Sequence, residues 1–443
     1  MSIPLQKIYS VFAPSPLRPD QQAMYVNLDD VRGDPGMVHG MAQKIRLSDE
    51  HTCQVLSGHR GSGKSTELGR LCKDLESPID GGAGYFVVRV QADDELDRND
   101  IDFPEVLIAI VRQMAAQLRE RKVMELKPGY FRDRWERLKK LALSEVSFEG
   151  LDLETGMATV STTVKNSPDA RLKVREALEP DTNNWLTATN DVIGEAIQGL
   201  QKKGRRGLVV IVDDLDKMIT RPHSSAGCST TEYLFVHRSA QLTAFHCHLI
   251  YTLPIDLAYS HHEPTIKRLY SGLPVVPMTK IASPPPRSRT YKPGVQKFRD
   301  MIDVRLQSVG AGRKDLFDSD EVCTDLIKLT GGQPTELMTL IREALVTNGL
   351  PIGPEGVKRC RVELMRGYRR QLRSDHWPLL EEAAQSGQVT RTLDNEAAFR
   401  ELLDSRALLL YRNDEEWYGV NPAIAGLKPP LSPSGSGNPG STP

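Results

Sequence analysis

The sequence predicts an α/β core built on a five-stranded parallel sheet, followed by a helical region and a C-terminal winged-helix domain. Three observations support this architecture. Short β-rich runs alternate with helical segments between residues 41 and 282, a purely helical pattern then extends to about residue 385, and a last helix is followed by two short β runs. Strands that alternate with helices are typical of parallel sheets with crossover helices.

The predicted strands are short apolar runs rich in β-branched residues. They cover residues 53–56, 85–91, 208–212, 247–252 and 273–276. Helices are predicted directly after Lys64 and from Pro104 to about Arg121. Asp102 suits the N-cap of the second helix, and proline suits a first turn because an N–H there has no partner within the helix.

An insertion at residues 122–200 separates the second and third strands. Its first part, residues 131–143, has the pattern of an amphipathic helix. Residues 146–164 alternate around Gly156, which predicts a β-hairpin with strand positions at Val146, Phe148, Leu151, Leu153, Val160 and Val164. A long helix, residues 182–201, then returns to the sheet.

Proline-, glycine- and serine-rich stretches set the predicted domain boundaries. The Pro-rich start is expected to lie across the surface of the next domain, and the tail has too few apolar residues to order itself. The predicted parts are an N-terminal extension (1–40), the core (41–282), a Pro-rich linker (283–294), a helical lid (295–352), a winged-helix domain (353–427) that ends in two strands around residues 414–415, and a disordered tail (428–443).

Composition excludes several classes of function. The 443 residues carry a net charge of −1, so no global attraction to nucleic acid or anionic membrane is expected. The longest apolar run, residues 106–111, is far shorter than a membrane span, and the N-terminus lacks a signal-peptide pattern, so we expect a cytoplasmic protein with no membrane partner. The 6 cysteines show no CxxC spacing, which predicts reduced thiols rather than zinc or disulfide frameworks.

The most specific motif is a glycine-rich loop between the first strand and the following helix. It fits G-x-x-x-x-G-K-[ST], the Walker A phosphate loop, in which backbone N–H groups and a helix N-terminus surround phosphate. Lys64 is expected to contact the β- and γ-phosphates of ATP with a solvent-facing charge that makes no core contact, and the Ser65 hydroxyl is expected to bind Mg²⁺. The predicted nucleotide-binding residues are Gly58, His59, Arg60, Gly61, Ser62, Gly63, Lys64, Ser65 and Thr66.

Two carboxylates follow the third strand, the apolar run at residues 208–212. Ligands of open α/β sheets bind beyond the carboxyl ends of the strands, so Asp213 and Asp214 are expected at the nucleotide. We assign Asp213 to Mg²⁺ and Asp214 to the general base that polarises the attacking water, the Walker B pattern. Because an aspartate is shorter than a glutamate, slow hydrolysis is expected.

These two motifs resemble those of the P-loop ATPases of the AAA+/STAND group, including KAP-like and origin-initiator-like relatives. The resemblance implies a five-stranded core, a helical lid and a winged helix. It also places Thr252 as the sensor-1 residue that reads the γ-phosphate, and the segment at residues 326–334 as the turn that opens a lid helix. The chain departs from AAA+ proteins at Thr335, where a sensor-2 arginine is common. Arg342 is an alternative there, and Arg268 is a weak arginine-finger candidate.

The function predicted is a Mg²⁺–ATP-dependent switch that hydrolyses ATP slowly and regulates a partner effector protein, with defence or stress signalling and a homo-oligomer as further expectations from the resemblance. The alternative is an ATP-gated DNA-binding initiator or loader. A basic segment at residues 358–373 favours the alternative through Arg366, Arg369 and Arg370. The presumed recognition helix, residues 394–405, opposes it because four carboxylates there face a single arginine.

Overall fold

The computed structural model describes residues 4–78, 82–126, 153–223, 226–412 and 415–427. The chain divides into two compact units. Unit 2 comprises Pro16–Gln22 and Asp34–Pro277, and unit 1 comprises Met1–Ser15, Ala23–Gly33 and Met278–Pro443. The predicted helix at residues 131–143 and the predicted tail at 428–443 lie outside the described residues.

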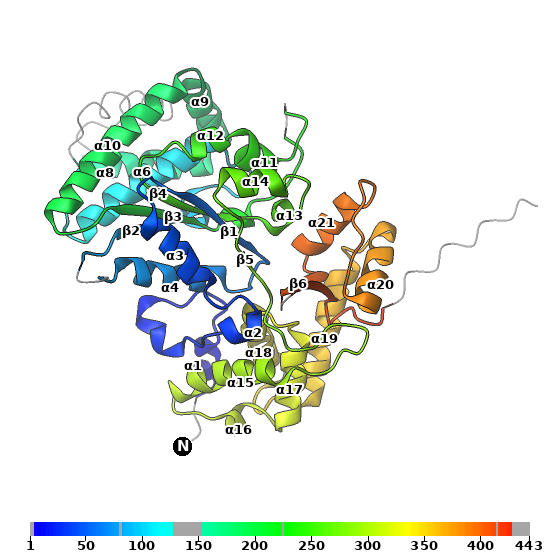
Figure 1. The fold of residues 1–443 in the computed structure, drawn as a ribbon. Helices are drawn as coiled ribbons and strands as arrows, with labels where there is room; N and C mark the ends of the chain where they lie inside the picture. The colour runs from blue at the N-terminus through cyan, green and yellow to red at the C-terminus, as the bar shows by residue number, and fades with distance from the viewer. Residues whose placement is uncertain (1–3, 79–81, 127–152, 224–225, 413–414, 428–443) are drawn as a thin grey trace, which may run out of the picture. The chain divides into compact units, whose positions relative to one another are not determined.

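Unit 2 contains a parallel five-stranded sheet in the order β2-β3-β4-β1-β5 (Figure 1). All five strands predicted from the sequence are present, although the last is short. They are β1 (Cys53–Gly58), β2 (Phe86–Gln91), β3 (Leu208–Asp213), β4 (His248–Leu253) and β5 (Val275–Val276). Because β4 lies between β1 and β3, the loops after these three strands meet at the carboxyl edge of the sheet.

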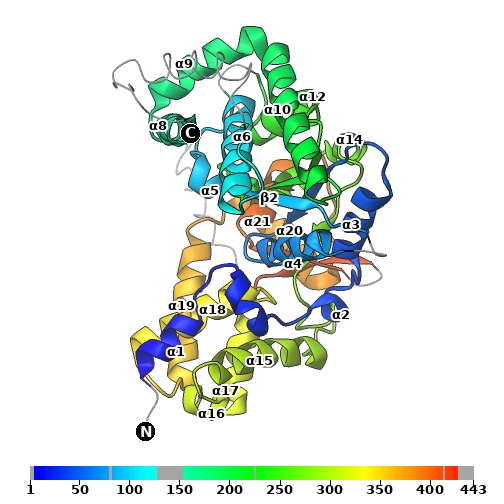
Figure 2. The ribbon, with the colours of Figure 1, turned by 90° about the vertical axis from the view of Figure 1, so that its left-hand side faces the viewer.

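Helices cover both faces of the sheet. On one face, α3 (Met37–Leu47) and α4 (Lys64–Glu76) bury Met41, Leu68 and Leu71 against strand residues such as Val209 and Ile211. Helix α6 (Phe103–Glu120) packs on β2, and α10 (Thr182–Lys202) on β3 (Figure 2). The shorter elements of the unit are the first part of η1 (Pro19–Met24), α5 (Ala92–Glu95), η3 (Leu215–Lys217), α11 (Thr230–Glu232), the π-helix η4 (Tyr233–His237), α12 (Ser239–Leu242), α13 (Ile255–Ala258) and α14 (Glu263–Leu269).

The start of α6 confirms the sequence prediction. Asp102 is the N-cap, and its side chain accepts a hydrogen bond from Phe103 N at 2.7 Å. Glu105 completes a capping box by accepting from Asp102 N at 2.8 Å. Pro104 lies in the first turn. The cap satisfies N–H groups that a helix cannot pair internally, which fixes where α6 begins.

The predicted β-hairpin at residues 146–164 is wrong in its described part. Residues 153–166 form a helix, α8 (Leu153–Asn166), which is followed by α9 (Pro168–Leu178) and η2 (Glu179–Asp181). Val160 and Val164 are four residues apart, so both lie on the helix face that is buried where α8 packs on α6. Tertiary burial of this face outweighs the alternating pattern around Gly156, on which the hairpin prediction depended. The long helix predicted after it is α10.

Unit 1 is mostly helical. Its helices are α1 (Leu5–Val11), α2 (Asp29–Arg32), α15 (Lys292–Gln307), α16 (Arg313–Leu316), α17 (Asp320–Leu329), α18 (Pro334–Asn348), α19 (Pro354–Arg369), η5 (Ser374–His376), α20 (Trp377–Ser386) and α21 (Glu396–Asp404). The N-terminal segment was expected on the surface of the next domain. Instead, residues 4–15 and 23–33 belong to unit 1, where Ile8 and Phe12 are buried and Lys280 N donates to Val31 O at 3.0 Å.

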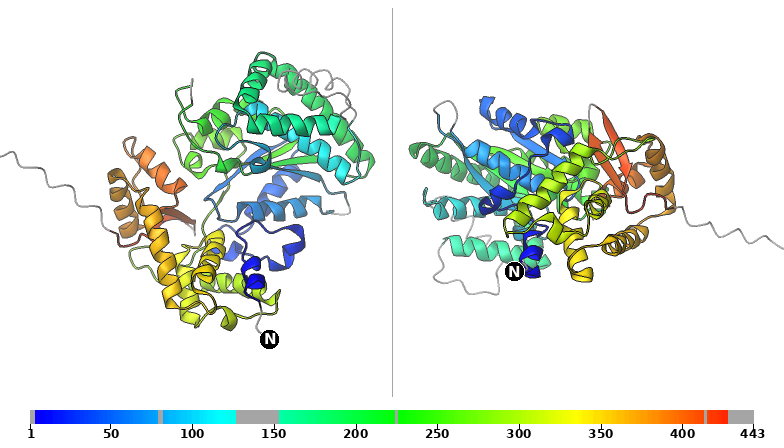
Figure 3. Two further views of the ribbon diagram at one scale, coloured as in Figure 1. Left: turned by 180° about the vertical axis from the view of Figure 1, so that it is seen from behind. Right: turned by 90° about the horizontal axis from the view of Figure 1, so that it is seen from below.

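An antiparallel pair of strands follows the last helices, as the winged-helix prediction requires. Strands β6 (Leu408–Arg412) and β7 (Glu416–Val420) pair around residues 413–415 and appear in orange-red in Figure 3. Tyr411 and Trp417 stack with ring centroids 4.2 Å apart and pack on Met278 and Leu409. The Tyr411 hydroxyl donates to Gly331 O at 2.6 Å, so this pair of strands is fixed to the turn that precedes α18.

No helix among the described residues is both long and apolar enough to cross a lipid bilayer.

A buried histidine at the amino edge of the sheet should make the fold sensitive to acid. His248 Nδ1 accepts from Thr52 N at 3.1 Å, and burial, with smaller contributions from His51 and Arg206, lowers the His248 pKa to about 4. The unfolded chain takes up this proton below a pH of about 6.5, whereas the folded chain does so only below about 4. Stability is therefore lost progressively as the pH falls through this window.

We expect His248→Asn, which keeps an acceptor for Thr52 but cannot be charged, to lose less stability than the wild type between pH 7.5 and 5.5. The difference should be about 1 kcal/mol, or a few degrees in Tm. Thermal unfolding at the two pH values measures it, with the exposed His39→Asn as the control. Equal losses in wild type and His248→Asn would contradict the assignment.

Candidate nucleotide-binding site

The phosphate loop joins the end of β1 to the start of α4, where the motif predicted it. Gly58, Gly61 and Gly63 have φ values of 141°, 79° and 102°, which favour glycine over other residues. A Cβ at Gly58 would lie 2.5 Å from Val276 O, so the neighbouring β5 also requires glycine there. The loop thus turns sharply and leads into the N-terminus of α4, the arrangement that binds phosphate with backbone N–H groups.

Lys64 is the first residue of α4, and its side chain is only 5% exposed. Its Nζ donates to Gly58 O at 2.6 Å and to His59 O at 2.9 Å, and it lies 2.9 Å from Asp216 Oδ2. The expectation that Lys64 is a solvent-facing charge without structural contacts is therefore wrong. The lysine is anchored inside the loop by a buried ion pair, because three acceptors surround it.

Three carboxylates lie at the end of β3 and in the short segment directly after it. Asp213, Asp214 and Asp216 are buried, and one oxygen from each lies within 4.8 Å of the others. The Ser65 hydroxyl hydrogen-bonds to the Asp213 carboxylate, and Arg89 Nη2 lies 3.2 Å from Asp213 Oδ2. Carboxylate and hydroxyl oxygens are the ligands that Mg²⁺ prefers, so Ser65 and Asp213 fit the metal role that the sequence predicted.

Asp214 has a constrained position in this loop. Its φ is 69°, in the left-handed region, and its carboxylate lies 2.7 Å from Lys217 Nζ. Burial and then the adjacent Asp213 raise the Asp214 pKa to about 6, against the opposing effect of Lys217. Raised pKa values of this size are frequent at catalytic carboxylates, because a base is most useful when its pKa is close to the working pH.

Thr252 and Asp216 complete the group. Thr252, near the end of β4, is fully buried, and its Oγ1 accepts from Asp216 N at 3.3 Å. The predicted sensor threonine therefore touches the loop that carries the carboxylates. Asp216 was missed by the sequence reasoning, although its position two residues after Asp214 could have suggested it. The sequence does not show that its carboxylate turns toward Lys64.

The other predicted residues differ in their surroundings. His59 is buried in the loop, Arg60 Nη2 donates to Met218 O at 3.4 Å, and Thr66 N donates to Gly63 O in the first turn of α4. In unit 1 the alternative sensor residue, Arg342, lies 4.0 Å over the ring of Tyr9 on α1. In unit 2 Arg268 is exposed on α14. The structure thus groups the two Walker motifs and Thr252 in unit 2.

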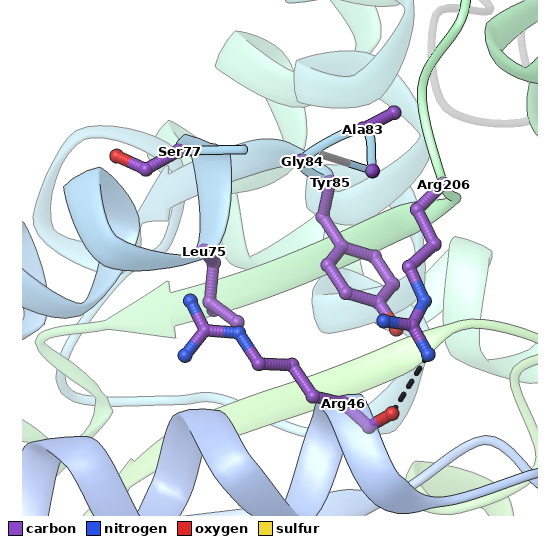
Figure 4. Close-up of a pocket in the computed structure, with 8 residues that line it drawn as sticks. Arg46, Leu75, Ser77, Ala83, Gly84, Tyr85 and Arg206 are labelled. Carbon is purple, nitrogen blue, oxygen red and sulfur yellow. Dashed lines mark hydrogen bonds between the residues drawn. The ribbon is translucent and has the colours of Figure 1, made fainter. Parts of the chain in front are cut away.

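A separate cavity of about 330 Å³ lies at the opposite, amino edge of the sheet, next to Tyr85 and Arg206 (Figure 4). Arg46 Nη2 donates to Asp74 O at 2.8 Å, and Arg206 Nη2 donates to Arg46 O at 2.7 Å. These bonds satisfy carbonyls at the C-terminal ends of α3 and α4. The arginines therefore connect two helix ends, and this cavity is distinct from the phosphate loop.

The sheet order, the phosphate loop and the acidic loop together define a P-loop nucleotide-binding fold. No protein-family model and no curated protein sequence matches the chain.

Solved structures to which the chain is similar are AAA+ origin-initiator proteins, one of the groups that the motifs resemble. The ORC2 protein of Aeropyrum pernix, in ADPNP–ADP complexes, matches over 94% of both chains at 12% identity with a TM-score of 0.41. The ORC1 protein of the same organism, in complex with DNA, matches over 93% of both chains at 12% identity and a TM-score of 0.38. Drosophila ORC bound to DNA matches over 94% of this chain and 88% of that chain, at 12% identity and a TM-score of 0.37.

The buried Lys64–Asp216 pair leads to a stability prediction. We expect Lys64→Ala to destabilise the fold by on the order of 3 kcal/mol, because it leaves the Asp216 carboxylate buried without its cation. The double variant Lys64→Ala with Asp216→Asn removes both charges and should recover most of this loss. Thermal unfolding without nucleotide measures both. Equal stability of Lys64→Ala and wild type would show that the pair contributes nothing.

Proposed function

We propose that the protein binds Mg²⁺–ATP at the phosphate loop, hydrolyses it slowly, and uses the nucleotide state as a switch. The observation that carries this proposal is the position of Lys64 inside the loop, 2.9 Å from one carboxylate of a buried group of three. A lysine at a helix N-terminus and a neighbouring group of carboxylates that can bind a metal are the parts that position a triphosphate and its metal.

The roles of the residues follow from their contacts. Lys64 would bind the β- and γ-phosphates, and Ser65 and Asp213 would hold Mg²⁺, which would supply positive charge against the phosphates. Asp214 accepts a proton from the attacking water. Thr252 accepts a hydrogen bond from Asp216 N and so connects the end of β4 to the acidic loop. A γ-phosphate that contacts Thr252 would therefore affect the position of that loop.

Asp216 has a consequence for nucleotide binding. Its carboxylate is paired with the Lys64 ammonium, which is the group that a phosphate oxygen would have to contact. Two anions at this position would repel each other electrostatically. Binding of ATP therefore requires that the Asp216 carboxylate moves away from the Lys64 ammonium. This exchange couples occupancy of the loop to the position of the segment after β3, which is what a switch requires.

The two carboxylates after β3 give a test of the mechanism. Asp214→Asn should bind Mg²⁺–ATP with an affinity close to that of the wild type but lose at least about 100-fold in kcat, since an amide cannot accept the proton. Asp213→Asn should instead weaken binding in the presence of Mg²⁺ more than in its absence. Calorimetric titration and phosphate release measure these effects.

Two results would contradict this mechanism. Reversed behaviour of the two variants would exchange their roles. The Lys64→Ala with Asp216→Asn variant serves as the folded control that should not bind ATP. An ATP affinity equal to that of the wild type would contradict the assignment of the phosphate loop as the nucleotide site.

We infer that the output of the switch passes to a partner protein, and an ATP-gated DNA-binding initiator or loader is the second candidate. The DNA candidate has one local observation in its favour. Exposed basic residues of α19 and the segment after it include Arg366, Arg369 and Arg370. Arg366 is paired with Glu363 at 2.7 Å. Two of the similar solved structures are complexes with DNA, which agrees with this candidate better than with a protein effector.

The charge on α21 opposes sequence-specific contact with DNA. This helix presents Glu396, Glu401 and Asp404, and Arg400 is its only arginine. Arg373 pairs with Glu401 at 2.5 Å, so part of the negative charge is compensated. We therefore expect any DNA contact to use phosphates rather than bases.

Titration of short duplexes of unrelated sequence, at low and near-physiological salt and with and without ATP, distinguishes the two candidates. We expect weak binding that is independent of sequence and disappears at the higher salt. Replacing Arg366, Arg369 and Arg370 with Ala should then reduce the salt slope by about 2 to 3. Nanomolar binding to one sequence at physiological salt would favour the initiator or loader.

A further inference from the structure

The helical insertion between β2 and β3 is attached to the segment that follows β2. Lys165 of α8 donates from Nζ to Asp93 O at 2.6 Å and to Asp94 O at 2.9 Å, and Ser161 Oγ donates to Glu95 Oε2 at 2.9 Å. These contacts connect two consecutive turns of α8 to α5. Helix α8 therefore fixes the backbone directly after the second strand.

Helix α9 strengthens this attachment farther along the same segment. The Arg171 guanidinium is 4% exposed and lies 2.9 Å from Asp97 and 3.1 Å from Asp100. Arg175 lies 2.9 Å from both Asp100 and Glu105. Because several of these groups are buried and multiply paired, residues 93–105 are held firmly to α8 and α9.

A chain of charges leads from this segment to the predicted base. Lys217 Nζ lies 2.9 Å from Asp93 Oδ2 and 2.7 Å from Asp214 Oδ1, so it bridges the two carboxylates. Arg98 holds Asp93 from the other side through two hydrogen bonds. The backbone carbonyl of Asp93 accepts the hydrogen bond from Lys165. Two residues, Asp93 and Lys217, therefore connect Lys165 of the insertion to Asp214 through direct contacts.

We infer that Lys217 is a positioning residue for Asp214 and that the insertion controls hydrolysis through Asp93 and Lys217. This inference rests on the proposed ATPase function and names its regulation. Asp214 has a left-handed backbone and stands among other carboxylates, so it needs a cation to hold it in one orientation. Lys217 supplies that cation, and its own position depends on Asp93. A ligand or partner that displaces α8 thereby changes the turnover rate without entering the nucleotide site.

The first experiment separates turnover from nucleotide binding. Lys217→Met should lower kcat by about 10-fold or more while KM for ATP changes by less than about 3-fold, because the residue acts on the base and not on the phosphates. Lys217→Arg keeps a cation able to bridge two carboxylates and should retain most of the wild-type kcat. A higher kcat in Lys217→Met, or an equal loss in Lys217→Arg, would overturn the positioning role. Thermal unfolding and ATP titration verify that each variant is folded and binds nucleotide.

The second experiment tests the connection to the insertion. Lys165→Met, far from the nucleotide in sequence, should lower kcat by about 3- to 10-fold, and the Lys165→Met with Lys217→Met double variant should be no slower than Lys217→Met alone. Lys202→Met, an exposed lysine at the end of α10, is the matched control and should leave kcat unchanged. The connection would be overturned if the kcat losses of the two single variants multiplied in the double variant. It would also be overturned if Lys165→Met left kcat unchanged. Failure of the wild type to hydrolyse ATP would instead overturn the proposed function itself.

Discussion

The structure depends on how three buried carboxylates are neutralised at the carboxyl edge of one sheet. Asp213, Asp214 and Asp216 lie within 4.8 Å of one another, and each faces a different cation. Arg89 comes from β2, Lys64 from the start of α4, and Lys217 from the turn after the acidic loop itself. Burying three negative charges in so small a volume is costly unless each is paired, so the strands and helices that supply the cations must stay in register. The same charge density makes the site suitable for a divalent metal.

The sheet topology explains why these cations can converge. Parallel strands end at one edge, and placing β4 between β1 and β3 brings Thr252 to Asp216. On the far side of β3, strand β2 pairs in a register that sets Gln91 beside Asp213, and Asp93 follows two residues later. Residues from four segments of the chain thereby occupy one loop cluster. The insertion reaches the same cluster through α8 side chains that hydrogen-bond to α5, so a segment without catalytic residues of its own acquires a mechanical connection to the site.

The sequence predicted most of the secondary structure because local signals and tertiary packing agree there. The Asp102–Glu105 capping box starts α6 as expected, and five short apolar runs form the five strands. Local signals and tertiary packing disagree in α8. Threonines and valines favour a strand there, but Val160 and Val164 are buried on a helix face against α6. The N-terminal segment shows a similar limit. Its proline-rich composition indicates a surface position, whereas Ile8 and Phe12 are buried within unit 1.

By itself the sequence determined the phosphate loop, the acidic loop and their positions after the first and third strands. Such motifs are local, and their glycines and consecutive carboxylates are required by the backbone conformations and ligands they serve. Only the tertiary structure decided how the charges pair. Lys64 meets Asp216 rather than solvent, Lys217 bridges Asp214 and Asp93, and Lys165 holds the backbone beside Asp93. Pairing of this kind depends on which side chains the folded sheet brings within about 3 Å of one another, and separation along the chain does not encode that distance.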